Sequence, residues 1–266
     1  MKKIFKKIWL RVLKCIINLD KSSVFKMLKS EDFDEIVLKL NDPSQFEWPR
    51  IRLASRPSKF EDLTALFFCS PLNRGILRQD IDEAALLFKY VSEIDSPKGV
   101  EIGRFYGGST VLLGTAVGKE GRLYSIDISP KNQDTELINI LRETGLNERV
   151  KLIIGDANSV EINEDLDFVF IDGDHSYNGA RLDHNKWGAK IKKGGFIIHH
   201  DMTNSRMYST QWNVLRQLYE SIIFFQKGYI KVFAEAGSMI IFQRISDTWI
   251  DVPIATESKE NTQINT

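Results

Sequence analysis

The stretch VEIGRFYGGST, residues 100–110, joins a short apolar run to a helical pattern through a turn rich in glycine. Glycine lets the backbone turn sharply and approach a ligand closely. The spacing differs from the G-x-G-x-x-G of dinucleotide-binding turns, and the carboxylate of Glu101 would repel a pyrophosphate placed there. The turn therefore favours a ligand that carries a cation or an amine, and it disfavours a nicotinamide-dependent oxidoreductase.

Strand and helix patterns alternate from residue 98 onward. The expected strands are Gly99–Ile102, Arg122–Ile126, Val150–Ile154, Leu166–Ile171, Phe196–His200, Tyr229–Phe233 and Ser238–Arg244. Helices are expected after Asp80 and at Thr110–Gly118, Asn132–Glu143 and Tyr177–Lys192. This alternation predicts an α/β fold whose parallel sheet is covered on both faces. The short connection Ala234–Gly237 favours an antiparallel last pair of strands.

Acidic residues follow the second and third of these strands as well as the first. An open α/β sheet binds its ligand at the carboxyl ends of its strands. Asp127 is placed there to accept hydrogen bonds from both hydroxyls of a ribose, and Asp156 is placed to accept one from the exocyclic amine of a base. A ligand that combines an amine, a ribose and an adenine without a phosphate is S-adenosylmethionine.

The runs VEIGRFYGGST, YSID, IIGDA, FVFIDGDHSY and KKGGFIIHHD resemble, in this order, the class I S-adenosylmethionine-dependent methyltransferases. The resemblance covers residues 80–245. The IDGDHSY run is most similar to the branch of macrocin O-methyltransferases and cephalosporin hydroxylase-like proteins, and more distantly to catechol O-methyltransferase. The resemblance implies a seven-stranded, Rossmann-like, mostly parallel sheet with an antiparallel last strand.

The same resemblance implies roles for individual residues. Glu101, Gly103, Gly107 and Ser109 match the motif that holds the methionine part of the cofactor, Asp127 matches the ribose-binding acid, and Asp156 and Ala157 match the adenine-binding position. In metal-dependent relatives the position of Asp172 is a magnesium ligand, and two further ligands follow the fifth strand. Asp201 fits one of these positions, whereas His200 stands where an oxygen ligand is expected.

The identity of a metal at this place is open. Magnesium prefers oxygen ligands, and manganese or iron tolerates imidazole better. The alternative is that no metal binds, and that Asp172 and Asp201 contact the cofactor or the substrate directly.

His175 is the expected general base. It lies three residues after Asp172, where catechol-type enzymes carry a basic lysine, and a histidine can remove the proton of an acceptor hydroxyl. Asp172 is expected to support this catalysis, and His200 is a competing base. His184, between Asp183 and Asn185 on a predicted helix, is expected to be solvated.

The expected function is O-methylation of a sugar, glycan or other small hydroxylated metabolite, as in carbohydrate or natural-product biosynthesis. The alternative is a non-catalytic binding or assembly module on the same fold. Aromatic and arginine side chains suit a polar ring bearing carboxylate or phosphate. The candidates for acceptor contacts are Trp48, Arg50, Arg52, Arg74, Arg78, Tyr177, Arg181, Arg206, Tyr208 and Trp212.

The charges of the chain are segregated at its beginning. The 266 residues include 36 basic and 36 acidic side chains, a balance that argues against nucleic acid as the main partner. Residues 1–29, however, hold nine basic side chains and one acidic one. Residues 1–19 alternate apolar and basic pairs at helical spacing, which predicts a basic amphipathic helix over 1–30. Such a helix suits peripheral contact with an anionic membrane, and packing on the domain or on a second subunit of a homo-oligomer is the alternative.

The rest of the chain divides into three parts. Residues 31–79 contain four prolines and are expected to cap the cofactor-binding domain at 80–245, and a polar tail is expected at 246–266. The two cysteines, Cys15 and Cys69, are too few for a disulfide framework and favour a reducing, cytoplasmic compartment. The amphipathic helix would associate the protein with the inner face of the membrane.

Overall fold

The computed structural model describes residues 53, 55–67, 76–77, 79–128, 133–202 and 210–254. These residues all belong to the compact unit Trp48–Thr266. The predicted basic helix at 1–30, most of the predicted cap at 31–79 and the end of the tail from residue 255 lie outside them. None of the helices in the described ranges has the length and apolar character that crossing a membrane requires.

Seven strands form one sheet in the order β3-β2-β1-β4-β5-β7-β6. Their bounds are β1 Lys98–Ile102, β2 Arg122–Asp127, β3 Val150–Ile154, β4 Leu166–Ile171, β5 Ile191–His199, β6 Ile230–Ala236 and β7 Met239–Arg244. Strands β1 to β5 pair in parallel, and β7 runs antiparallel to both β5 and β6. The predicted Rossmann-like sheet with its antiparallel last strand is confirmed.

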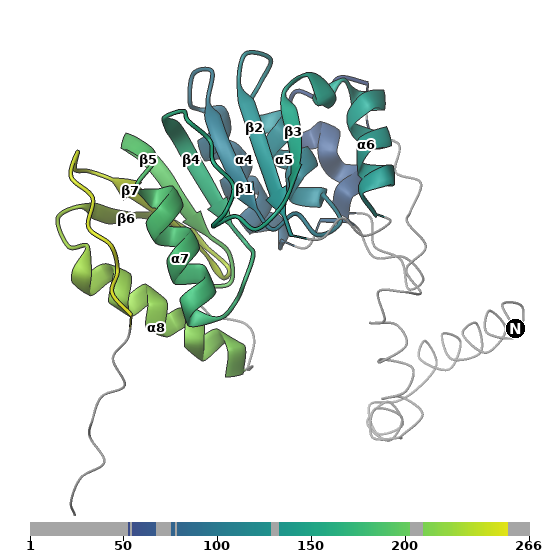
Figure 1. Cartoon of the computed structure of the whole chain (residues 1–266). Helices are drawn as coiled ribbons and strands as arrows, with labels where there is room; N and C mark the ends of the chain where they lie inside the picture. The colour runs from purple at the N-terminus through teal and green to yellow at the C-terminus, as the bar shows by residue number, and fades with distance from the viewer. Residues whose placement is uncertain are drawn as a thin grey trace, which may run out of the picture. The chain divides into compact units, whose positions relative to one another are not determined.

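Helices cover both faces of this sheet (Figure 1). They are α4 Ile81–Ser92, α5 Gly108–Ala116, α6 Gln133–Thr144, α7 Tyr177–Gly188 and α8 Thr210–Phe225, with 3-10 turns η2 Phe60–Phe67 and η3 Leu146–Glu148. Helices α4 and α5 contact each other behind the sheet in this view, and α7 and α8 contact each other in front of it. Capping residues mark the N-termini of two of these helices. Asp80 and Glu83 form a capping box on α4, and Ser176 Oγ accepts the Gly179 N–H at the start of α7.

The core lies between the sheet and these helices. Strand β4 is buried almost throughout, as expected for a central parallel strand covered on both faces. Its Phe168 and Phe170 are fully buried, and so are Trp187 of α7 and Phe242 of β7. Burial of such large apolar side chains stabilises the fold by roughly 1.5–3 kcal/mol each.

Several elements differ from the sequence-based expectation, among them β6, which runs to Ala236 and not only to Phe233. Strand β5 begins at Ile191 and not at Phe196, and α7 ends at Gly188, so the lysine-rich segment after α7 belongs to the strand. A register shift in the β4–β5 pairing accommodates this longer strand. Helix α8 is not among the expected helices, because the only residue of this stretch considered was Trp212, as an acceptor contact. Its buried Leu215, Leu218 and Ile222 follow helical spacing, which is the signal that identifies it.

The packed region extends through Val252, beyond the expected boundary at 245. Val252 is fully buried and its backbone N–H donates to Asn185 Oδ1 at 2.9 Å. Its carbonyl accepts from Asn185 Nδ2 at 2.9 Å and from Arg181 Nη1 at 3.0 Å. Arg181, an expected acceptor contact, therefore holds the C-terminal segment on α7.

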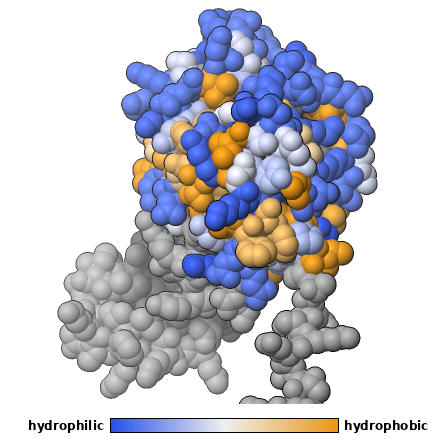
Figure 2. Space-filling view, turned by 90° about the vertical axis from the view of Figure 1, so that its left-hand side faces the viewer, coloured by the Kyte–Doolittle hydropathy of each residue, from blue (hydrophilic) through white to orange (hydrophobic). Residues whose placement is uncertain are grey.

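Strand β6 forms one edge of the sheet and pairs, within the described residues, with β7. Val232 and Phe233 of this strand remain partly exposed, and Phe224 near the end of α8 is largely exposed. Figure 2 shows this side of the molecule, where hydrophobic side chains stand among hydrophilic ones. An edge of this kind offers backbone groups to another strand.

The prediction that His184 is solvated is wrong. His184 is fully buried on the face of α7 that packs against β5, where its Nδ1 lies 2.9 Å from His199 Nε2. Its Nε2 lies 2.8 Å from Gln226 Oε1. Since Gln226 Oε1 can only accept, His184 donates through Nε2 and accepts from His199 through Nδ1. Burial keeps both rings neutral: it lowers the pKa of His184 to about 4 and that of His199 well below its usual value.

The His184→Gln variant should reveal this buried pair through the pH dependence of stability. Above about pH 6.5 His184 is neutral in the folded and unfolded states. Below it the unfolded chain binds a proton that the folded chain excludes, so stability is lost by about 1.4 kcal/mol per pH unit until the folded pKa is reached. Urea unfolding near pH 7.5 and near pH 5 should show the wild type losing about 2 kcal/mol relative to the variant over this range. Parallel pH profiles would contradict the prediction.

Candidate functional site

A cavity of about 800 Å³ opens at the carboxyl ends of the parallel strands. Its wall includes the carboxyl groups of Asp127, Asp156, Asp172, Asp174 and Asp183. Arg104, the basic side chain among the described lining residues, is paired with Asp134. The cavity has the size of a small-molecule site, and its charge suits a ligand with a cationic or amine-bearing group.

The glycine turn after β1 shapes the floor of this cavity. Gly103 has φ of 82°, and a Cβ there would lie 2.2 Å from the carbonyl oxygen of Asp172. Gly107, with φ of 81°, is the N-cap of α5, and a Cβ there would lie 2.5 Å from Leu137. Both positions thus require glycine, and the turn brings the start of α5, with Ser109, to the cavity wall. Gly107 itself shapes the turn without lining the cavity.

Glu101 lies behind the turn and not on the cavity wall. Its side chain is fully buried, and Oε2 accepts hydrogen bonds from Thr110 Oγ1 and Ser125 Oγ, both at 2.6 Å. Burial raises the pKa of this carboxyl group against the opposing effect of these hydroxyls. Its Oε1 has no hydrogen-bond partner among the described residues. Glu101 therefore connects α5 to β2 beside the cofactor-sized cavity.

Asp127, Asp156 and Ala157 line the cavity, as the sequence predicts. Asp127 Oδ2 accepts the backbone N–H groups of Arg104 at 2.9 Å and Phe105 at 3.1 Å, so the glycine turn fixes the orientation of this carboxylate. Asp156 Oδ1 accepts the N–H of Asn158 at 2.9 Å.

Asp183 of α7 is a cavity residue that the sequence did not reveal. It is only 4% exposed, and its Oδ1 accepts from Asn158 Nδ2 at 3.0 Å. Burial, with the neighbouring charges of Asp156 and Asp174, raises the pKa of Asp183 to about 7. The sequence shows polar residues at helical spacing on one face of α7. This pattern is equally typical of a solvent-exposed helix face, so it did not identify Asp183 as a cavity residue.

Arg104 also went unrecognised, because nothing in the local pattern distinguishes it from an exposed turn residue. It is 2% exposed and forms a two-pronged pair with Asp134 of α6, with Nε–Oδ1 3.1 Å and Nη2–Oδ2 2.7 Å. Its Nη1 donates to the carbonyls of Ser125 at 3.2 Å and Ile153 at 2.9 Å. One side chain thus joins the glycine turn to β2, β3 and α6.

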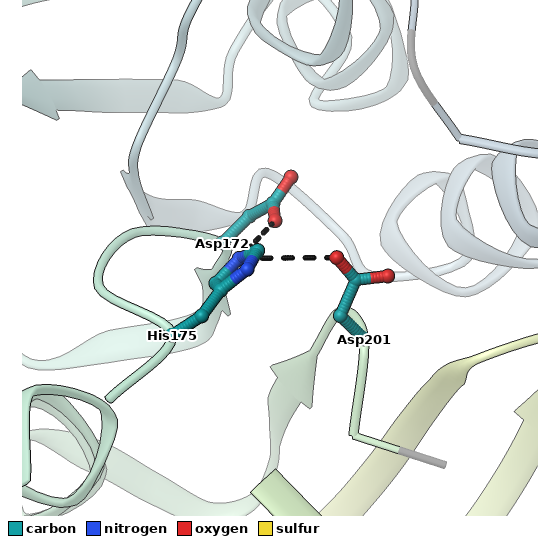
Figure 3. A group of neighbouring side chains, drawn as sticks. All are labelled: Asp172, His175 and Asp201. Atoms are coloured by element: carbon teal, nitrogen blue, oxygen red, sulfur yellow. Dashed lines mark ion pairs between the residues drawn. The ribbon is translucent and has the colours of Figure 1, made fainter. Parts of the chain in front are cut away.

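Two histidines and two aspartates meet at the ends of β4 and β5. Figure 3 shows the His175 ring between Asp172 and Asp201, with Nε2 3.5 Å from Asp172 Oδ1 and 3.8 Å from Asp201 Oδ2. One potential ligand atom from each of these three side chains lies within 4.8 Å of the others. His200 approaches the same carboxylates: its Nδ1 is 3.2 Å from Asp172 Oδ1 and 3.3 Å from Asp201 Oδ1. The structure thus brings together the four side chains expected at this place.

Glu83 of α4 is a further member of this group that the sequence did not indicate. Its Oε2 lies 3.1 Å from His200 Nε2, and it accepts two hydrogen bonds from Ser238. Burial alone would raise the pKa of Glu83, but His200 and Ser238 outweigh it and lower this pKa to about 2. The residues are 117 positions apart, so no local pattern connects them.

The carboxylates and imidazoles of this group stabilise each other's charged forms. Burial would raise the pKa of Asp172, but His200 and His175 lower it to about 2. Burial would lower the pKa of His200, but Asp172, Asp201 and Glu83 raise it well above its usual range. The hydrogen bond to Asp172 raises the pKa of His175.

The donor set mixes carboxylate oxygens with imidazole nitrogens. Such a set fits a divalent ion that tolerates nitrogen, such as manganese or iron, and it departs from the oxygen set of a magnesium site. The residues present therefore suit a divalent ion that tolerates nitrogen better than they suit magnesium.

Tyr177 and Trp212 are the other described positions among the expected acceptor contacts. Tyr177 Oη lies 3.1 Å from Ser221 Oγ and the ring packs against the core. Trp212 lies within α8. Trp48, Arg50, Arg52, Arg74, Arg78, Arg206 and Tyr208 lie outside the described residues.

Known proteins share this architecture and part of this sequence. A family model described as "Methyltransferase domain" matches residues 100–202. Catechol O-methyltransferase of Mycobacterium tuberculosis is 29% identical over 108 residues, which is 40% of this chain and 47% of that protein. Caffeoyl-CoA O-methyltransferase 2 of Populus trichocarpa is 26% identical over 155 residues, which is 55% of this chain and 60% of that protein. The matches thus span about half of each relative.

Solved structures show the same fold. An O-methyltransferase of Bacillus cereus in complex with SAH has a TM-score of 0.50 at 20% identity, covering 62% of this chain and 82% of that one. SAH-bound methyltransferase PaMTH1 of Podospora anserina has a TM-score of 0.52 at 15% identity, covering 82% of this chain and 97% of that one. At these identities the structures establish the fold.

The Arg104→Met variant should lower the free energy of unfolding by about 3–5 kcal/mol, because Asp134 would lose its buried partner. Urea unfolding at neutral pH measures this loss. The control is Arg142→Met, on the exposed face of α6, the helix that also carries Asp134. This control should change stability by no more than about 0.5 kcal/mol. Equal effects of the two variants would show that Arg104 does not hold the turn.

Proposed function

We propose that this chain, which carries a methyltransferase domain related to the class I S-adenosylmethionine-dependent O-methyltransferases, binds S-adenosylmethionine and methylates a hydroxyl of a small acceptor. The observation that carries the proposal is the cavity rich in carboxylates at the glycine turn. A sulfonium ion and an α-amino group both bring positive charge, and a pyrophosphate would be repelled by the same wall.

The cofactor would lie along the carboxyl edge of β1, β2 and β3. Ser109 and the turn at Gly103 would hold the methionine part, with Glu101 fixing the start of α5 from behind. Asp127 would accept hydrogen bonds from the ribose, and Asp156 and Ala157 would contact the adenine. Asp172, at the end of β4, lines the same cavity and would face the reacting end of the cofactor.

Methyl transfer is a displacement at the sulfonium carbon. The acceptor oxygen forms a bond to this carbon while the carbon–sulfur bond breaks, and its electron pair remains on sulfur. We assign to His175 the removal of the hydroxyl proton, through Nδ1, while its Nε2–H faces Asp172 Oδ1 at 3.5 Å. Asp172 orients the ring and stabilises the imidazolium that forms.

A divalent metal belongs to this proposal as an acceptor-binding group. Asp172, Asp201 and His200 would hold it, and a bound metal would supply charge that favours the ionised acceptor oxygen. The chemistry of the donor set, described above, supports this assignment.

The acceptor class proposed is a sugar, glycan or other small hydroxylated metabolite. Its support is the IDGDHSY run, which resembles the macrocin-type branch. The catechol and caffeoyl-CoA O-methyltransferases among the relatives support O-methylation of a small acceptor, without indicating a sugar. The second candidate, a binding module without catalysis, would keep cofactor affinity without turnover. Peripheral contact of residues 1–19 with a membrane, a cytoplasmic location and self-association rest on the sequence and remain proposals.

Methyl-transfer assays of the full chain separate these candidates. The acceptor panel comprises nucleotide sugars, glycans and small phenols, and mass spectrometry detects the gain of one methylene unit. Turnover on a panel member supports the enzyme, whereas cofactor binding without turnover on any member favours the binding module.

The Asp127→Asn variant should bind S-adenosylmethionine roughly ten- to a hundred-fold more weakly, because the ribose would lose charge-assisted hydrogen bonds. The amide oxygen can still accept the N–H groups of Arg104 and Phe105, so the turn should persist. Isothermal titration calorimetry measures the affinity, and Asp165→Asn at an exposed site before β4 is the control. Unchanged affinity in Asp127→Asn would refute this placement of the ribose.

The His175→Gln variant should lower kcat by roughly 10²- to 10⁴-fold, which is the usual contribution of a general base. Affinity for S-adenosylmethionine should stay constant, since His175 acts on the acceptor. Turnover on an acceptor found in the panel, with Lys193→Gln on the exposed part of β5 as control, measures the effect. A kcat close to that of the wild type would show that another group removes the hydroxyl proton.

A further inference from the structure

We propose that Glu83 and His200 act together to give this site a nitrogen ligand, so that it binds Mn²⁺ or Fe²⁺ in preference to Mg²⁺. The inference rests on the proposed function in that it names the ion used at the same catalytic edge. It concerns His200, which replaces an oxygen ligand of the set implied by the resemblance, and Glu83, which contacts the second nitrogen of His200.

The spacing of the donors is the first argument. His200 Nδ1 lies 3.2 Å from Asp172 Oδ1 and 3.3 Å from Asp201 Oδ1. Ligand atoms that surround one ion at about 2.1 Å lie roughly 3.0–3.4 Å from one another. Both distances from His200 Nδ1 therefore fall in the range expected for ligands that share an ion.

The second argument is the partner of the other ring nitrogen. Histidines that bind metals almost always donate their second N–H to a carboxylate or carbonyl, which fixes the tautomer and the ring orientation. His200 Nε2 lies 3.1 Å from Glu83 Oε2. A proton on Nε2 leaves the lone pair of Nδ1 directed at Asp172 and Asp201, which is the state a metal requires.

Glu83 is itself held firmly. It is 3% exposed, its Oε2 accepts the N–H of Asp80 at 2.8 Å, and its Oε1 accepts the N–H of Ser238 at 2.6 Å. Ser238 Oγ lies 2.9 Å from Glu83 Oε1 and 3.0 Å from Asp201 Oδ1. One serine between β6 and β7 thus positions both the carboxylate behind His200 and a direct ligand.

His175 is the less suitable nitrogen donor. Its side chain is 36% exposed, against 9% for His200, and its Nε2 is 3.5 Å and 3.8 Å from the two aspartates. It stands on the open side of the carboxylates, where an acceptor arrives. The two imidazoles therefore have different roles: His200 binds the ion, and His175 remains available as the base.

The ion preference follows from ligand chemistry. Magnesium requires near-ideal octahedral oxygen coordination, whereas imidazole suits iron and is tolerated by manganese. An imidazole ligand thus favours Fe²⁺ and Mn²⁺ over Mg²⁺, and His200→Asp should remove this preference.

The experiment titrates the full-length protein with Mn²⁺ alone, followed by electron paramagnetic resonance, and then displaces it with Mg²⁺. The wild type should bind one Mn²⁺ at least roughly tenfold more tightly than Mg²⁺. His200→Asp should bring the two affinities together by tightening Mg²⁺. Glu83→Gln should weaken Mn²⁺ by roughly 10- to 100-fold, with Glu161→Gln, an exposed carboxylate on the same domain, as control. His175→Gln should retain Mn²⁺ binding.

The inference is overturned if the wild type binds Mg²⁺ as tightly as Mn²⁺, if it binds neither ion, or if Mn²⁺ binding requires His175 and not His200. The wild-type comparison decides selectivity even where a variant fails to fold. Calorimetry with S-adenosylmethionine is run on the same samples. Cofactor binding without Mn²⁺ binding would refute the metal and leave the proposed function standing, and Mn²⁺ binding without cofactor binding would do the reverse.

Discussion

The close approach of Gly103 to Asp172 is the constraint on which the site depends. A Cβ at Gly103 would lie 2.2 Å from the Asp172 carbonyl oxygen, and the Asp172 N–H donates to Ile102 at 2.9 Å. The Gly103 N–H in turn donates to Ile126 at 2.9 Å. Three parallel strands are therefore held in register at their carboxyl ends. This contact places the turn that would bind the cofactor directly beside the carboxylate proposed to serve catalysis.

Charge then separates this edge into two regions. On the side proposed for the cofactor, the carboxylates of Asp127 and Asp156 line the cavity, while the positive charge of Arg104 is directed away into Asp134. On the side proposed for the acceptor, Asp172 and Asp201 face two imidazoles. The first region suits a ligand that brings its own positive charge, and the second suits a reaction that needs a base and a cation.

The fold and the residues at strand ends were predictable because both leave local patterns. Apolar runs of strand length identify β1 to β5, and Asp127, Asp156 and Asp172 follow directly at the edge where parallel strands bind ligands. Contacts between distant segments leave no such pattern. Glu83, Arg104 and His184 each read locally as ordinary polar residues on a helix or turn, and no local pattern pairs them with His200, Asp134 and His199. Their roles follow only from burial, which opposes an unpaired charge or an unbonded ring nitrogen.

Burial is also what distinguishes the four histidines. His184 and His199 are buried against each other, and burial outweighs the charge of Asp251 near His184, so they stay neutral and serve the core. His200 is nearly as buried but has carboxylates on both ring nitrogens, which makes it a ligand or a cation and leaves it little freedom to exchange protons with an acceptor. His175 combines an acidic partner with an open face. A general base needs both an orienting group and access to substrate, and among these rings His175 has both.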